Sequence, residues 1–175
     1  RDARLAQDNS SVEPAIRTVV DYLRTEEKQN ISAVALLQPT TPFRKVSDID
    51  EALQVFANSG ASSVVSVTPA IANQNPHWML KRTDEGRVKL FNGEELKRIK
   101  NRRQALPEVF IRNDFVYVLR PENLYEDPPT LYGETPELMV VDENRLDVDI
   151  NNERDWAIAE IVHKIFLENQ DEIEN

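Results

Sequence analysis

The chain has 175 residues, of which 40% are hydrophobic and 30% are charged. This length and composition predict one globular domain with a single core, and they exclude a disordered chain. The net charge is −10 and cysteine is absent, so the average surface repels nucleic acid and anionic membranes, and disulfides and thiolate metal sites are excluded.

No apolar run approaches the roughly 20 residues that a membrane-spanning helix needs. The opening stretch "RDARLAQDN" lacks the features of a signal peptide. A chain without cysteine also fits a reducing compartment. We therefore expect a cytoplasmic protein with neither a nucleic-acid partner nor a membrane partner.

The first half of the sequence predicts alternating helices and strands. A helical stripe contains Val12, Ala15, Ile16, Val19, Val20 and Leu23. Its expected start is a capping box of Ser10 and Glu13, with Pro14 in the first turn. The strand "AVALLQ" follows, and then a helix capped by Ser47, with Ile49, Leu53 and Phe56 on its inner face, that stops at Ser59 and Gly60. The strand "SSVVSVTP" completes a pattern that predicts a parallel sheet with crossover helices.

Residues 73–129 differ in character, because short strand-like pieces such as "HWMLKR" and "RVKLF" alternate with polar turns. They predict a small antiparallel excursion from the main sheet. Its apolar residues Val109, Phe110, Phe115 and Val116 suggest a ribbon that needs a partner surface, since a two-stranded ribbon is marginal alone. We expect that partner to be a second copy of the chain.

The last part of the chain predicts strands at "LMVV" and "RLDVDI" and a closing helix from position 153. The residues expected to face inward from that helix are Ile158, Ile161, Val162, Ile165 and Phe166. The sequence contains no internal repeat and no low-complexity linker.

The stretch "LLQPTTPFR", residues 36–44, is a candidate ligand site. An apolar strand leads directly into Gln38, two prolines, two threonines and Arg44. Open α/β sheets bind ligands beyond the carboxyl ends of their strands. A rigid turn that carries an amide, hydroxyls and a guanidinium at such a place therefore indicates binding.

The stretch "LDVDINNERD" is a candidate magnesium site. Alternation along a strand would place Asp147, Asp149 and Asn151 on one face, where a cation between the oxygens would relieve their repulsion. In the alternative interpretation, Asn151 and Asn152 cap the last helix and the aspartates face water.

The stretch "NRRQALPEVFIRNDFVYV" concentrates hydrogen-bond donors around a strand. They are Arg102, Arg103, Gln104, Arg112, Asn113 and Tyr117. This set suits a ligand with a carboxylate and several hydroxyls, because guanidinium matches carboxylate geometry. An interface or an exposed β-ribbon explains it equally well. The basic residues at 97–103 likewise indicate either a solvated helix face or a local anion site.

Five pieces in order resemble the acylneuraminate cytidylyltransferases, the CMP-sialic acid synthetases. They are "RDARLAQDNSS", "LLQPTTPFR", "SVVSVTP", "RRQALPEVFIRNDFVYV" and "VDINNERDWAIAE". The resemblance covers nearly the whole chain. It implies a three-layer Rossmann-like nucleotide-diphospho-sugar transferase fold with a mainly parallel sheet and a small antiparallel dimerisation excursion.

The resemblance also implies the reaction and its partners. The enzymes of this family join CMP from CTP to a nine-carbon sugar acid of the sialic type, and they release pyrophosphate. Mg²⁺ is the expected cofactor, and the family forms homodimers through the excursion. The activated sugar would serve the biosynthesis of cell-surface polysaccharide.

The resemblance assigns roles to particular residues. Catalysis is expected of Asp149 and Arg103, and metal binding of Asp149 and Asn151. Nucleotide binding falls to Arg1, Ala6, Asp8, Ser10, Gln38 and Arg44. Sugar binding falls to Gln38, Arg103, Gln104, Asn113 and Tyr117.

The sequence departs from the family pattern at three points. The strand and loop that hold the CTP phosphates have no counterpart here, so we expect either a truncated protein or a fragment with very low activity alone. Asn151 replaces a carboxylate expected at the metal, and Asp114 replaces a glycine beside the presumed sugar site. The alternatives are an inactive binding or oligomerisation module of this fold and a cytidylyltransferase for another sugar acid.

Overall fold

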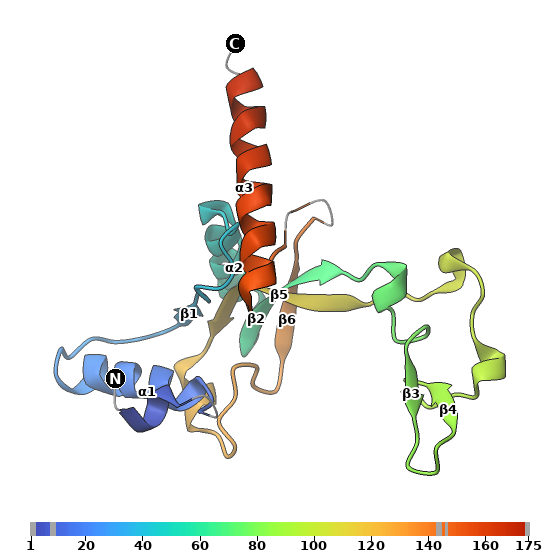
Figure 1. The fold of residues 1–175 in the computed structure, drawn as a ribbon. Helices are drawn as coiled ribbons and strands as arrows, with labels where there is room; N and C mark the ends of the chain where they lie inside the picture. Colours follow the sequence, from blue (N-terminus) through green and yellow to red (C-terminus); the bar gives the residue numbers. More distant parts are fainter. Residues whose placement is uncertain (1–2, 8–9, 143–144, 146, 174–175) are drawn as a thin grey trace. The chain divides into compact units, whose positions relative to one another are not determined.

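The computed structural model describes residues 3–7, 10–142, 145 and 147–173, with side chains in the last helix up to residue 165. The chain divides into two compact units (Figure 1). The first contains Arg1–Ser66, Asn113–Met139 and Asn144–Asn175, and the second contains Val67–Arg112 and Val140–Glu143. The predicted excursion at 73–129 overlaps the second unit, and its role in sugar binding and dimerisation stays a prediction.

The main sheet has four strands in the order β1-β5-β2-β6. Their bounds are Val34–Leu36 for β1, Ser63–Pro69 for β2, Phe110–Leu119 for β5 and Pro136–Val140 for β6. β5 runs antiparallel to β1, with Tyr117 opposite Leu36. The fold is therefore α/β with a mixed sheet. The parallel majority and the three layers stay predictions.

The core of the first unit is formed mainly by β2 and β5. Val64, Phe115, Val116 and Leu119 are fully buried. A near-continuous apolar run such as "FVYVL" is typical of a strand covered on both faces. Buried polar groups on β2 find partners, because the backbone N–H of Val116 donates to Ser66 Oγ at 2.9 Å.

Among the residues that the structure describes, three α-helices belong to the first unit, and the sequence predicted all of them. They are α1 at Glu13–Thr25, α2 at Val46–Ser59 and α3 at Glu153–Ile173. Pro14 lies in the first turn of α1 as expected. Gly60 ends α2 in the left-handed conformation, with φ of 68°. None of the helices in the described residues is long and apolar enough to cross a membrane.

Both predicted helix caps are wrong. The N-cap of α1 is Val12, and the hydroxyl of Ser10 instead donates to the carbonyl of Arg4 at 2.8 Å. In α2, Ser47 lies inside the helix. The carboxylate of Asp48 there accepts the backbone N–H of the N-cap residue Lys45 at 2.7 Å. A carboxylate at the third helical position that accepts the N-cap N–H supplies the reciprocal bond of a capping box.

The predicted inner face of α3 is wrong at three of its five residues. Ile158, Ile161 and Ile165 are 40%, 58% and 53% exposed. The helix buries Ala159 instead, with Asp155 and Val162 half-buried beside it. These three residues are spaced at i, i+4 and i+7, so the contact face is about one residue step away from the predicted one. The side chain of Phe166 lies outside the described residues.

The second unit contains a separate antiparallel hairpin, which confirms antiparallel strands in this part of the chain. β3 spans Leu80–Arg82 and β4 spans Val88–Leu90, with Leu80 opposite Leu90. Short 3₁₀ turns complete the chain: η1 at Ala3–Ala6, η2 at Ala72–Gln74, η3 at Leu96–Arg98, η4 at Arg103–Ala105 and η5 at Pro121–Tyr125.

Candidate functional site

The turn at residues 38–44 follows β1 and is fixed by Arg44. Nη2 of Arg44 donates to Gln38 O at 2.6 Å and to Thr41 Oγ1 at 2.7 Å, and its Nε donates to the carbonyl of Phe115 on β5. Burial lowers the pKa of Arg44, and the charge of Asp48 offsets part of that effect. Arg44 therefore uses these donors to hold the turn against β5. Its contact with a nucleotide stays a prediction.

Thr41 adds a second link between the 38–44 turn and β5. It is only 2% exposed, and its Oγ1 lies 3.1 Å from Gln38 O and 3.2 Å from Asp114 O. The hydroxyl of Thr41 and the guanidinium of Arg44 both bond to the backbone carbonyl of Gln38. The half-buried side-chain amide of Gln38 takes no part in these bonds. Bonds from Thr41 and Arg44 thus tie the turn to β5.

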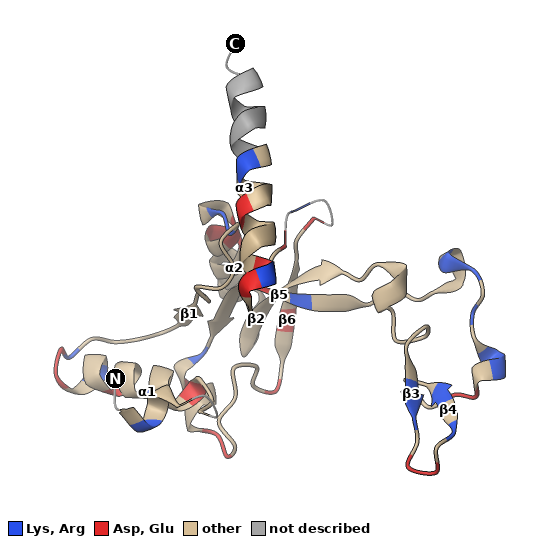
Figure 2. Ribbon diagram, in the orientation of Figure 1, with Lys and Arg blue, Asp and Glu red and all other residues tan. Residues whose placement is uncertain are grey.

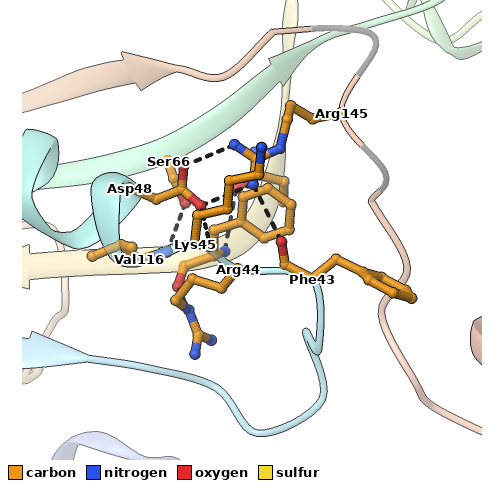
Figure 3. A network of polar contacts seen from close by, with 9 residues as sticks. Phe43, Arg44, Lys45, Asp48, Ser66, Val116 and Arg145 are labelled. Atoms are coloured by element: carbon orange, nitrogen blue, oxygen red, sulfur yellow. Dashed lines mark hydrogen bonds and ion pairs between the residues drawn. The ribbon is translucent and has the colours of Figure 1, made fainter. Parts of the chain in front are cut away.

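An ion pair between the buried Asp48 and the half-buried Arg145 supports the turn (Figure 3). Nη1 and Nη2 of Arg145 donate to Oδ1 and Oδ2 of Asp48 at 2.9 and 3.0 Å, and Nη2 also donates to Phe43 O at 3.2 Å. The guanidinium lies 5.5 Å from the ring centroid of Phe115. Burial alone would raise the pKa of Asp48. The hydrogen bonds from Arg145 and Lys45 and the charges of both residues outweigh it and hold that pKa below its usual range.

The 149–151 segment lies against the same turn, because the backbone N–H of Ile150 donates to Thr40 O at 2.9 Å. Nδ2 of Asn151 donates to Oδ2 of Asp149 at 2.7 Å, and its backbone N–H donates to Oδ2 of Asp155 at 3.0 Å. Oδ1 of Asp149 is buried and has no hydrogen-bond partner. A buried carboxylate oxygen without a partner is costly unless something else satisfies it.

The predicted strand at "RLDVDI" is wrong, because residues 147–150 are irregular. The alternation of Asp and hydrophobic residues resembles a half-buried strand, but hydrogen bonds to the 38–44 turn and to Asp155 shape this segment instead. Asp147 is exposed, whereas Asp149 is half-buried. The alternative in which the asparagines cap α3 is confirmed for Asn152, whose Oδ1 accepts the backbone N–H groups of Arg154 and Asp155.

The orphaned oxygen of Asp149 fits a bound cation. Since Nδ2 of Asn151 is directed at Asp149, its amide oxygen is the atom left to act as a ligand. Among the described residues no group of three or more His, Asp or Glu could hold a metal ion. A magnesium ion here would therefore take one or two protein oxygens and complete its shell with phosphate oxygens and water, the usual arrangement for Mg²⁺ with nucleotides.

Two of the predicted sugar ligands are buried in β5. Asn113 is 3% exposed, and its Oδ1 accepts the backbone N–H of Phe115 at 3.3 Å. Tyr117 is 2% exposed, and its hydroxyl donates to Oδ1 of Asp114. Their direct contact with a sugar stays a prediction. Asp114, between them, is half-buried.

The other predicted site residues belong to other elements of the chain. Arg103 and Gln104 belong to η4 in the second unit and are exposed, and their role stays a prediction. Ala6 is exposed in η1, and Ser10 bonds to the backbone of Arg4. Arg1 and Asp8 lie outside the described residues.

An apolar cavity of about 310 Å³ adjoins the 149–151 segment. Its lining comes from the 38–44 turn, the 149–151 segment and α3: Pro42, Phe43, Ile150, Trp156, Ala159, Glu160 and His163. The sequence alone predicted neither this cavity nor the pair of Asp48 and Arg145. The two charges are 97 positions apart, so no local pattern could pair them.

Comparisons with known proteins show which kind of enzyme the chain is similar to. No protein-family model matches the chain. It is 29% identical over 165 residues to a CMP-N,N'-diacetyllegionaminic acid synthase of Legionella pneumophila, covering 91% of this chain and 66% of that protein. It is 28% identical over 165 residues to N-acylneuraminate cytidylyltransferase B of Danio rerio, covering 91% of this chain and 35% of that protein.

This chain is similar over most of its length to cytidylyltransferases of the acylneuraminate type. It spans less than two thirds of the length of either relative. The resemblance drawn from the five sequence pieces is thereby confirmed at the level of the family.

Proposed function

We propose that this chain is a cytidylyltransferase domain that joins CMP from CTP to a sialic-type nine-carbon sugar acid and releases pyrophosphate. One observation carries the proposal. In a homologue of such enzymes, the unpaired oxygen of Asp149 is held beside the 38–44 turn through the bond between Ile150 and Thr40. A carboxylate oxygen left without a partner next to a candidate nucleotide turn supports a metal-assisted transfer.

The reaction that we propose is a displacement at phosphorus. The anomeric hydroxyl of the sugar acid attacks the α-phosphorus of CTP, a P–O bond forms, the bond to the β-phosphate breaks and pyrophosphate leaves. Catalysis of such steps rests mainly on positioning and on electrostatic stabilisation of the charge that develops. In this chain Arg44, Thr41 and the pair of Asp48 and Arg145 keep the turn rigid.

Magnesium is part of the proposal. Asp149 and Asn151 would hold it, and when bound it supplies Lewis acid chemistry and orients the phosphates. Bonds from Ile150 to Thr40 and from Asn151 to Asp155 fix the backbone that carries these two side chains.

The carboxylate of the sugar acid is proposed to bind near Arg103 and Gln104. Between residues 67 and 112 the chain has ten Lys and Arg against five Asp and Glu, although the whole chain is acidic (Figure 2). Arg103 is exposed and is therefore available for a bidentate contact with a carboxylate. CTP, the sugar acid and a homodimer are the proposed partners, and a cytoplasmic location stays a prediction.

Asp149→Asn tests the proposal. Pyrophosphate release from CTP and N-acetylneuraminic acid is measured with Mg²⁺, and Mn²⁺ binding in the presence of CTP is followed by electron paramagnetic resonance. We expect the variant to lose at least about 100-fold in turnover, because a developing charge loses its stabilisation, and to bind Mn²⁺ much more weakly. Asp50→Asn, an exposed carboxylate on α2, is the matched control and should change neither.

The measurement of Mn²⁺ binding remains informative if the isolated chain releases pyrophosphate only slowly, as the sequence leads us to expect. Binding of CTP and Mn²⁺ that depends on Asp149 supports the site even then. A chain that binds CTP without turnover under all conditions would instead be a binding module of this fold. A chain with neither binding nor turnover would overturn the proposal.

A further inference from the structure

Asp114 interrupts β5 with an unusual backbone conformation. Its φ of 56° lies in the left-handed region, in the middle of a strand that spans Phe110–Leu119. Residues with a Cβ rarely adopt this conformation, and Asp and Asn are among the few that tolerate it. A left-handed residue within a strand is the feature of a bulge, and bulges next to functional sites re-aim side chains.

The consequence is a contact that a regular strand would not allow. Side chains three positions apart point to opposite faces of a regular strand. Here the hydroxyl of Tyr117 donates to Oδ1 of Asp114. Tyr117 is 2% exposed and packs edge-on against Tyr132, with their ring centroids 6.3 Å apart. A buried phenol therefore fixes the direction of a half-buried carboxylate.

The backbone at Asp114 is held against the 38–44 turn. Thr41 Oγ1 lies 3.2 Å from the carbonyl oxygen of Asp114, and Arg44 donates to the next carbonyl, that of Phe115. Within the part of the chain that the structure describes, Asp114 forms no ion pair, and its Oδ2 has no hydrogen bond. One carboxylate oxygen is thus oriented by Tyr117 and the other remains an acceptor for a ligand.

We propose that Asp114 is a specificity-determining residue that accepts a hydrogen bond from a nitrogen-bearing substituent of the sugar acid. This inference rests on the proposed function. An ionised carboxylate only accepts hydrogen bonds, so it repels carboxylate and carbonyl oxygens and selects donors. Bonds to a charged acceptor are about twice as strong as neutral ones. The substituent is an acylamino N–H or an ammonium group, which share this donor chemistry.

Two substitutions preserve the backbone and remove the charge. Asn and Gly both adopt a φ near 56° readily, so Asp114→Asn and Asp114→Gly should fold, whereas Ala would add strain. Tyr117→Phe keeps the buried ring and removes the hydroxyl that orients Asp114. Asp50→Asn again controls for the change of net charge.

The experiment compares kcat/KM and calorimetric Kd for N-acetylneuraminic acid, for its analogue with a hydroxyl in place of the acylamino group, and for the free amine. We expect the preference for the nitrogen-bearing sugars over the hydroxyl analogue to fall at least about 10-fold in both Asp114 variants. A site built to bond a donor discriminates by that much or more. In Tyr117→Phe it should fall by a smaller factor, and in Asp50→Asn it should stay the same.

The outcomes separate the two proposals. A larger effect on the amine than on the acetamide identifies an ammonium group, and the reverse identifies an acylamino group. If the wild type and the Asp114 variants bind or convert the sugars with the same preference for the nitrogen-bearing forms over the hydroxyl analogue, this inference alone is overturned. Absence of binding and turnover with every sugar, together with absence of CTP binding, overturns the proposed function.

Discussion

At the scale of single residues, the pair of Asp48 and Arg145 links two distant parts of the chain beside the site. Asp48 is 4% exposed and caps α2 while it accepts two bonds from Arg145. Removing one partner of a buried pair leaves the other charge uncompensated. We expect Asp48→Ala to lower the free energy of unfolding by about 3 kcal/mol, measured by urea denaturation. Asp50→Ala, exposed on the same helix, should change it by less than about 0.5 kcal/mol.

The same pair predicts a pH dependence of stability. The pKa of Asp48 is lower in the folded chain than in the unfolded chain, because the bonds and charges of Arg145 and Lys45 outweigh burial. Its stabilising contribution is therefore complete above the unfolded value of about 4 and is lost as the pH falls through the lower folded value. The difference in unfolding free energy between wild type and Asp48→Ala should shrink below about pH 4. A difference that is constant from pH 7 to pH 3 would contradict this.

At the scale of elements, two glycines in the left-handed conformation allow the energetic cost of backbone strain to be separated from the cost of overpacking. Gly60 ends α2 with φ of 68°, and a Cβ there would meet nothing within 4 Å. Gly133 precedes β6 with φ of 63°, and a Cβ there would lie 2.7 Å from Ser62 Cβ and Oγ and 2.9 Å from Asn123 Nδ2. Ser62 Oγ is itself fixed by Tyr132 O and by the N–H of Thr135.

Substituting alanine at each position should give different losses. Gly60→Ala should lower the free energy of unfolding by about 1 kcal/mol, because alanine is disfavoured in the left-handed conformation and its Cβ meets no neighbour. Gly133→Ala should lower the free energy of unfolding by about 2–4 kcal/mol, because the left-handed strain adds to a clash with Ser62, which is fixed by its own hydrogen bonds. Thermal and urea unfolding of both variants measure the difference. Equal losses would show that the loop around Gly133 relaxes freely.

The elements also show what the sequence could predict. Apolar periodicity and turn residues predicted α1, α2 and the strand β2 with its buried run. Periodicity does not say which side of a helix meets the sheet when apolar residues surround it, and the inner face of α3 was therefore mistaken. The 149–151 segment alternates like a strand, but a tertiary bond to Thr40 and a local bond to Asp155 determine its path.

The candidate site was predictable to a similar extent. Gln38 and Arg44 were expected at the end of a strand, and the structure places them there. That Arg44 would turn its donors inward, and that Asn113 and Tyr117 would be buried, depends on how β5 packs. The left-handed conformation of Asp114 has no signal in a single sequence.

At the scale of the whole molecule, the predicted homodimer needs a revised interface. Phe115 and Val116, two of the four residues first assigned to it, are fully buried in the core of the chain. The second unit nevertheless exposes large apolar side chains: Leu80, Val88, Phe91, Phe110 and Ile111. Exposed apolar residues on a small unit often mark a surface that another protein covers.

We expect light scattering to show a dimer at micromolar concentration, and the double substitution of Phe110 and Ile111 by Glu to give a monomer. Both side chains are exposed, 36% and 37%, so the substitutions should disturb the folded chain little and the interface strongly. Charges buried in an interface without partners are costly. Val46→Glu, at a residue 74% exposed on α2, is the control and should leave the dimer intact. A monomeric wild type would refute the homodimer, and a dimeric double variant would place the interface elsewhere.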